Sequence, residues 1–256
     1  MRHQHHLEAD IHGVLSMARI ESMRLHINAE DIAVKCFAAQ TPWPYWSGLF
    51  LHGAGNSSKE RGDALCTEMA GRGMQSVAFD FSGWGASTRR VPGSIQKRVD
   101  EAAAVIERLI LPQGLPLVVM AFSMSGQVAI ELLRVFGQAI RCLALFNPAI
   151  YAAQALRIPF GPAFSEIIRR PQSWRQADIV SAFEGYRGLT LLFRSEFDDV
   201  IPPEVFSLIA QAAPADGFSE RLVAAAPHSL GAFLNAHPDA TARVADSIVG
   251  ALGPQP

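Results

Sequence analysis

Three side chains that together could activate a serine nucleophile occur in this chain, each shortly after a short apolar stretch. They are Ser123, Asp198 and His228, in that order along the sequence. A serine hydroxyl is a poor nucleophile unless a base takes its proton and a third group holds that base in the correct tautomer. The three residue types in this order therefore predict attack by a serine on an acyl carbon.

The turn around Ser123 has the composition that such a nucleophile needs. The stretch Val118–Gln127 passes from an apolar run into a helical pattern, which places the serine on a sharp turn at the positive end of a helix. Strand and helix approach closely there, so the residues two before and two after the serine must be small. Ala121 and Ser125 meet this requirement. The alternative is that Ser123 and Ser125 only cap the helix.

The elements that must position these residues alternate along the chain. Apolar runs predict strands over Ser22–Ile27, Ile32–Ala39, Gly48–Leu51, Gln75–Phe81, Leu115–Phe122, Ile140–Phe146, Leu189–Arg194 and Phe218–Ala225. Helical spacing predicts helices over Glu60–Arg72, Ile95–Ile110, Gln127–Phe136, Pro203–Ala213 and Phe233–Leu252. This alternation predicts one α/β domain over 1–256, a doubly wound and mostly parallel sheet covered on both faces. Ligands of such sheets bind at the carboxyl ends of the strands, where all three residues fall.

Two segments depart from this rhythm. Residues 147–188 contain four prolines and interrupt the alternation after the sixth strand, which predicts an inserted segment. Residues 1–20 begin with a polar, histidine-containing stretch and are expected to be loosely ordered.

Four short motifs make the chain resemble the α/β-hydrolase fold superfamily over roughly residues 22–252. They are Leu51-His-Gly-Ala-Gly55, Asp80-Phe-Ser-Gly-Trp-Gly-Ala-Ser87, Ala121-Phe-Ser-Met-Ser125 and Asp198-Asp-Val-Ile-Pro202. The first two are most similar to the branch of monoglyceride lipases and serine aminopeptidases, which carries a small helical lid where residues 147–188 lie. The turn departs from the family pattern G-x-S-x-G, because Ala121 and Ser125 replace both glycines.

The resemblance also implies roles for individual residues. Glu196, Asp198 and Asp199 are crowded together, and the family spacing to Pro202 selects Asp198 as the acid. The backbone amides of Ala54 and Met124 would form the oxyanion hole, which stabilises the negative charge of a tetrahedral intermediate. His52 would support its loop and would not act as a base.

The expected function is that of a serine hydrolase that cleaves an ester or related acyl bond of a small molecule through an acyl-enzyme. Carboxylesterases and lipases are the nearest type, and neither a cofactor nor a metal is expected. One alternative is a hydrolase-fold protein that binds a ligand without turnover. Another is dinucleotide binding, because Gly53, Gly55 and Ser58 followed by a strand and Asp80 imitate that fingerprint. That alternative leaves Ser123, Asp198 and His228 unexplained.

Composition excludes several other classes of protein. The chain has 22 basic and 24 acidic residues, which gives a net charge of −2 and none of the basic excess of a nucleic-acid binder. No run approaches the ~18 apolar residues of a membrane span, and the first ten residues do not read as a signal peptide. Three scattered cysteines suggest neither a zinc site nor a disulfide framework. A cytoplasmic protein with a small-molecule acyl substrate is expected, and no pattern indicates an oligomeric state.

Overall fold

A single mixed sheet organises the computed structural model, which describes residues 19–253. Within this range eight strands follow the order β1-β2-β4-β3-β5-β6-β7-β8. β1, β2 and β4 pair antiparallel, and every pairing from β4 to β8 is parallel. The predicted doubly wound, mostly parallel α/β sheet is therefore confirmed. The expectation of a loosely ordered terminus concerns residues that lie, up to residue 18, outside the described part.

The bounds of the elements agree with the predicted alternation to within a few residues at most ends. The strands are β1 (Ile20–Ile27), β2 (Glu30–Phe37), β3 (Trp46–Leu51), β4 (Met74–Phe79), β5 (Leu117–Phe122), β6 (Ile140–Phe146), β7 (Leu189–Phe197) and β8 (Phe218–Pro227). The helices are α1 (Asp63–Gly71), α2 (Ile95–Val105), α3 (Ser125–Phe136), α4 (Pro162–Ile168), α5 (Val180–Phe183), α6 (Pro203–Ala212), α7 (Leu230–Ala236) and α8 (Pro238–Leu252). A wider π-helical turn, Ile106–Ile110, continues α2.

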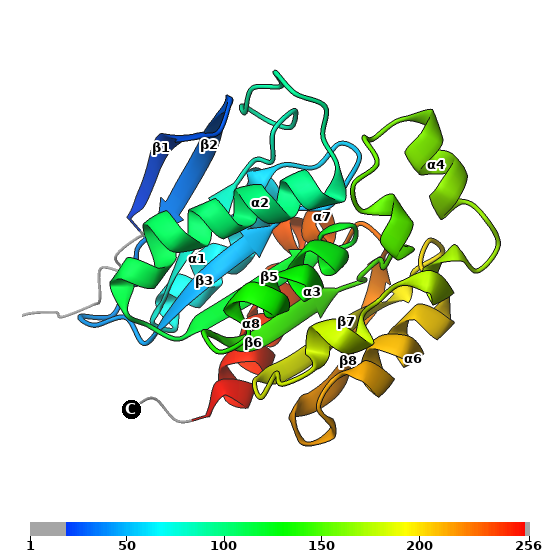
Figure 1. The fold of residues 1–256 in the computed structure, drawn as a ribbon. Coiled ribbons are helices and arrows are strands. Elements are labelled where there is room, and N and C mark those ends of the chain that lie inside the picture. The colour runs from blue at the N-terminus through cyan, green and yellow to red at the C-terminus, as the bar shows by residue number, and fades with distance from the viewer. Residues whose placement is uncertain (1–18, 254–256) are drawn as a thin grey trace, which may run out of the picture.

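Helices cover both faces of the sheet, as Figure 1 shows with α2 and α3 on one side and α1 and α8 on the other. Alternate strand residues serve the two cores: Leu49 and Leu51 of β3 pack toward α2 and α3, and Phe50 packs toward α1 and α8. All six residues of β3 and all six of β5 are buried. The loops that follow β3 and β5 therefore start from fully buried strand ends.

One predicted helix is wrong. The pattern over Phe233–Leu252 predicted a single helix, whereas the structure has α7 and α8 with a break at His237. Pro238 causes the break, because proline lacks an amide hydrogen and its ring clashes with the carbonyl four residues earlier. That carbonyl, of Leu234, accepts instead from the His237 amide at 3.1 Å and from the Thr241 hydroxyl at 2.6 Å.

Two further sequence expectations concern membranes and cysteines. No helix within residues 19–253 is both long enough and apolar enough to cross a bilayer. Cys66 and Cys142 are buried, Cys36 is half-buried, and all three thiols are free. Cys66 and Cys142 pack in the core on the α1 and α8 face, and Cys36 packs against the core on the opposite face.

A buried carboxylate on β2 anchors the segment that leads into α2. Glu30 accepts from the ammonium of Lys97 at 2.7 Å, from the hydroxyl of Thr88 at 2.7 Å, and from the amides of Arg90 and Val91 at 3.0 Å. Burial alone would raise the pKa of Glu30, but these donors lower it from 4.5 to about 2. The ionised form is therefore favoured by the fold.

This site predicts an acid-dependent loss of stability. An acid whose pKa is lower in the folded state stabilises the fold above its unfolded pKa, and that contribution disappears as the pH falls through the folded value. The free energy of unfolding of wild type is expected to exceed that of Glu30→Gln by roughly 1–2 kcal/mol at pH 6. A larger difference is not expected, because water partly screens the ion pair with Lys97. The difference should shrink as the pH falls from 4.5 toward 2. Urea unfolding of both proteins at pH 6 and pH 3 measures it, and an unchanged difference would contradict the assignment.

Candidate active site

Ser123 occupies a sharp turn between β5 and α3. Its φ of 49° lies in the left-handed region, which side chains other than glycine rarely adopt. The carbonyl of Ser123 accepts from the amides of Gly126 and Ala149, at 2.8 and 2.9 Å, so the turn is fixed from two sides. Gly126 has no room for a side chain, because a Cβ there would lie 2.5 Å from the Cβ of Pro148. The chain is thus forced into the geometry that presents the serine hydroxyl at the sheet edge.

The structure brings together the three residues singled out from the sequence. The Oγ of Ser123 lies 3.0 Å from Nε2 of His228. The Nδ1 of His228 lies 2.9 and 3.0 Å from the two carboxylate oxygens of Asp198. The carboxylate side chain is 3% exposed and the imidazole 18% exposed. Asp198 is therefore shielded from water, and the Nε2 edge of the imidazole faces the hydroxyl of Ser123.

This arrangement selects one tautomer of His228. A carboxylate can only accept hydrogen bonds, so Nδ1 must carry the hydrogen that it shares with Asp198. Nε2 then has a free lone pair directed at the hydroxyl of Ser123. The imidazole is oriented to remove the serine proton, which is the role of a general base.

The neighbouring acids have different positions. Glu196 accepts from the backbone amide of Ala225 at 2.7 Å, and Ala225 has a φ of 57°, so Glu196 supports a strained position near the end of β8. Asp199 is exposed. The hydrogen bonds that close this turn belong to Asp198, whose Oδ1 accepts from the amides of Val200 and Ile201 at 2.9 and 3.1 Å. The same carboxylate thus meets the histidine and closes its own turn.

A buried asparagine holds the histidine loop, and sequence reasoning gave it no role. Asn147, at the end of β6, has a φ of 43° and is fully buried. Its Nδ2 donates to the hydroxyl of Ser195 at 2.7 Å and to the carbonyl of His228 at 3.1 Å, and its Oδ1 accepts from the Ser195 amide. Asn147 therefore links β7 to the backbone of His228. Its place at a strand end was the one signal in the sequence.

The loop after β3 supplies the first of two amides near Ser123. Among the described residues, neither the amide of Ala54 nor that of Met124 has a hydrogen-bond acceptor. His52 is buried, and its Nε2 accepts from the amide of Phe81 at 3.1 Å. Burial, together with the charge of Arg98, lowers the pKa of His52 to about 3. A neutral, fully engaged imidazole of this kind supports the loop, as expected.

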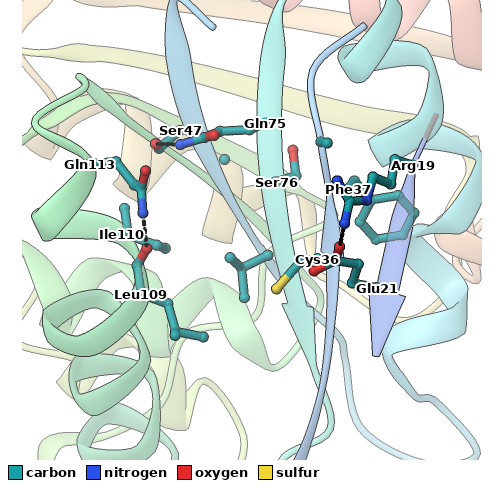
Figure 2. A pocket seen from close by; sticks show the side chains of 13 residues that line it. Arg19, Glu21, Cys36, Phe37, Ser47, Gln75, Ser76, Leu109, Ile110 and Gln113 are labelled. Carbon is teal, nitrogen blue, oxygen red and sulfur yellow. Dashed lines mark hydrogen bonds and ion pairs between the residues drawn. The ribbon is translucent and has the colours of Figure 1, made fainter. Parts of the chain in front are cut away.

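A cavity of about 500 Å³ lies over the serine. Ser123, His228 and Ala54 line it together with apolar and small residues, among them Phe122, Phe146, Val200, Ile201 and Leu230. Its size suits a small molecule. A second cavity, of about 360 Å³, lies near the amino-terminal ends of β3 and β4, and Ser123 is not among its lining residues. Figure 2 shows this cavity from close by. Polar groups there pair with one another, including the amide of Gln75 with the hydroxyl of Ser47 at 3.1 Å.

The segment 147–188 is built from short helices, including α4 and α5, and has its own packing. Phe164, Phe183 and Tyr186 are buried within the core on the α2 and α3 face. Tyr151 from the beginning of this segment lines the cavity over Ser123. The buried aromatic residues Phe164, Phe183 and Tyr186 therefore attach segment 147–188 to the rest of the domain.

The geometry at Asp80 removes the partner that a dinucleotide would need. Its carboxylate is fully buried and accepts from the ammonium of Lys59 at 2.6 Å and from the amides of Lys59 and Ala86 at 2.8 and 2.9 Å. A Cβ at Gly85 would overlap this carboxylate, and Gly85 also has a φ of 49°. Asp80 thus organises its own loop and is closed to a ribose hydroxyl.

Comparison with known proteins also indicates a hydrolase. The family model of serine aminopeptidase S33 (Hydrolase_4) matches residues 46–180. No curated protein matches the chain in sequence. Solved structures with the same fold include the Est1E protein of Butyrivibrio proteoclasticus bound to ferulic acid (14% identity, TM-score 0.69, covering 89% of this chain and 99% of that one). Others are the esterase domain of a Rhodothermus marinus protein (16%, 0.64, 90% and 96%) and the haloalkane dehalogenase DatA of Agrobacterium tumefaciens C58 (12%, 0.69, 91% and 97%).

Proposed function

The chain belongs to the serine aminopeptidase S33 family of α/β hydrolases, and we propose that it is a serine esterase acting on a small acyl substrate. One observation carries the proposal: the hydrogen-bonded series Ser123–His228–Asp198 opens into a cavity of about 500 Å³. A serine that only capped a helix would not need a histidine at 3.0 Å from its hydroxyl.

The reaction proceeds in two halves. His228 takes the proton of Ser123 as the serine oxygen bonds to the ester carbonyl carbon, and the carbonyl π electrons move to its oxygen. When the tetrahedral intermediate collapses, the bond to the alcohol oxygen breaks, and the alcohol leaves with the proton held by His228. Water then repeats the sequence against the acyl-enzyme, releases the carboxylic acid and restores the serine hydroxyl.

Two backbone amides would stabilise the negative charge on the oxygen of the tetrahedral intermediate. The amides of Ala54 and Met124 are both unpaired among the described residues and flank Ser123 from the β3 loop and from the start of α3. Donors fixed before the reaction stabilise the oxyanion without reorganising, which is worth about 10²–10³ in rate for each donor.

The charge of the cavity favours an ester over an amino-terminal peptide. An aminopeptidase must pair the positive ammonium of its substrate, usually with a carboxylate. None of the described residues that line the cavity is acidic, and Arg61 places a positive charge there. A substrate ammonium would be repelled by Arg61 and would find no carboxylate among the described residues that line the cavity.

Two measurements test the proposal. We expect the purified protein to react covalently with a fluorophosphonate probe, because only an activated serine attacks such phosphorus centres. We also expect hydrolysis of p-nitrophenyl esters of short acids, and no release of p-nitroaniline from amino-acid p-nitroanilides with a free amino group. Absence of labelling would support the alternative of a ligand-binding protein without turnover. Faster cleavage of the anilides than of the esters would make the protein a peptidase.

A further inference from the structure

Arg98 on α2 is a buried cation without a carboxylate partner among the described residues. It is 1% exposed, and none of the described carboxylates lies within ion-pair distance of its guanidinium, although Glu101 attracts its charge from further away. Its central carbon lies 4.4 Å from the ring centre of Phe81, 4.2 Å from that of Trp84 and 5.6 Å from that of Phe160. Aromatic faces attract such a cation, but they do not replace the hydration that it loses on burial.

The guanidinium directs its hydrogen bonds at one loop. Nη1 donates to the carbonyl of Gly53 at 3.2 Å and reaches the carbonyl of His52 at 3.5 Å. Nε and Nη2 have no hydrogen-bond partner among the described residues. Burial lowers the pKa of Arg98 to about 9, so the side chain remains charged at neutral pH. An apolar side chain could occupy this space without the free-energy cost of burying a charge. Arginine differs from such a side chain in the hydrogen bonds that it donates to the loop.

The carbonyl of Gly53 belongs to the same peptide group as the amide of Ala54. A trans peptide is planar, and its C=O and N–H point in opposite directions. The carbonyl is held on the buried side by Nη1 of Arg98 and, at 2.8 Å, by Nδ1 of His52. The amide of Ala54 is thereby directed away from Arg98, on the side of the cavity that Ala54 and Ser123 line.

Other contacts hold the same loop but do not act on this peptide. The hydroxyl of Ser125 donates to the carbonyl of His52, and the indole of Trp84 donates to the carbonyl of Gly55 at 3.0 Å. The Gly53–Ala54 peptide is therefore aligned from behind by a neutral imidazole and a cation. Since a hydrogen bond polarises the next group along, the cation also strengthens the amide as a donor.

We propose that Arg98 is a positioning residue for catalysis, which aligns and polarises the Gly53–Ala54 peptide so that the Ala54 amide stabilises the oxyanion. This inference rests on the proposed function, because it needs Ala54 to face a developing negative charge. Arg98 itself does not touch the substrate. Its effect should therefore appear only where the oxyanion forms.

Substitution of Arg98 tests this with three readouts. In Arg98→Met, which removes the hydrogen-bond donors and the charge but keeps an unbranched apolar side chain, we expect kcat for a p-nitrophenyl ester to fall by about 10–100-fold with KM nearly unchanged. The affinity for a boronic acid, which forms a tetrahedral adduct on the serine, should fall by a similar factor. Arg108→Met is the control, because Arg108 lies in the turn that continues the same helix and also donates to a backbone carbonyl, that of His26 at 2.6 Å, but not to the Gly53–Ala54 peptide. It should leave kcat within about threefold of wild type.

Arg98→Lys decides the matter if the methionine variant does not fold. Lysine keeps the charge, but its nitrogen ends one atom short of Nη1, so we expect an intermediate loss of kcat, about fivefold or more, and a parallel loss of boronic-acid affinity. Wild-type kcat and inhibitor affinity in the folded variants, or a loss confined to KM, would overturn the proposal. Failure of the proposed function looks different, because wild type itself would then neither hydrolyse esters nor react with a fluorophosphonate.

Discussion

Replacing Ser123 with alanine is expected to abolish both covalent labelling by a fluorophosphonate and ester hydrolysis, while the protein still folds. In the proposed mechanism this hydroxyl supplies the bonding oxygen of the acyl-enzyme, and among the described residues it is the group hydrogen-bonded to Nε2 of His228, at 3.0 Å. Loss of the nucleophile in enzymes of this type lowers kcat by about 10⁴-fold or more. The hydroxyl makes one partly buried hydrogen bond, so the melting temperature should change little. Labelling, turnover and thermal unfolding of the variant measure these effects.

Ser125→Ala is the matched control for this experiment. Ser125 lies two residues further along the same turn, but it is fully buried and its hydroxyl donates to the carbonyl of His52. It is expected to keep the labelling and to lose about 1 kcal/mol of stability, as a buried carbonyl loses a donor. Full labelling of Ser123→Ala together with loss of labelling in Ser125→Ala would move the nucleophile to Ser125.

The order of elements and the place of the site could be predicted from the sequence because both follow from local patterns. A short apolar run such as Leu117–Phe122 favours a buried strand, and parallel strands bring the residues after them to one edge of the sheet. Ser123, Asp198 and His228 meet there for this reason. The sequence also indicated that Ala121 and Ser125 were small enough for the turn, and both are fully buried in it.

What could not be predicted depends on contacts between distant segments. Asn147 joins β7 to the carbonyl of His228, and Glu196 bonds to the amide of Ala225, but neither pairing has a signal in spacing. Arg98 occupied a helical pattern as one polar residue among others, and only the fold reveals that it is buried. The break at Pro238 was missed because the apolar spacing continues through it in the sequence. Sequence periodicity thus predicts the strands and helices that carry the site, but it does not predict the long-range hydrogen bonds that hold the site residues in place.

The acid of the site is expected to matter through the tautomer of His228. Asp198→Asn should lower kcat by a factor on the order of 10²–10⁴ with only a modest change in melting temperature. The amide of asparagine can present its NH₂ group to Nδ1, which favours the tautomer with hydrogen on Nε2. That hydrogen would face the hydroxyl of Ser123 and prevent the imidazole from accepting the serine proton. The Oδ1 of asparagine can still accept from the amides of Val200 and Ile201, so the turn should persist.

Asp199→Asn and Glu196→Gln are the controls that decide the assignment. Asp199 is exposed, and Glu196 accepts from the backbone of Ala225, so no tautomer of the histidine depends on either side chain. We expect Asp199→Asn to lose less than about tenfold in kcat, and Glu196→Gln to act mainly on stability. Rates of ester hydrolysis for the three variants, measured side by side with their unfolding curves, separate the roles. Equal losses at 198 and 199 would indicate a shared carboxylate function, and a larger loss at 199 would transfer the role to Asp199. We expect the larger loss at Asp198, because its carboxylate lies 2.9 Å from Nδ1 of His228.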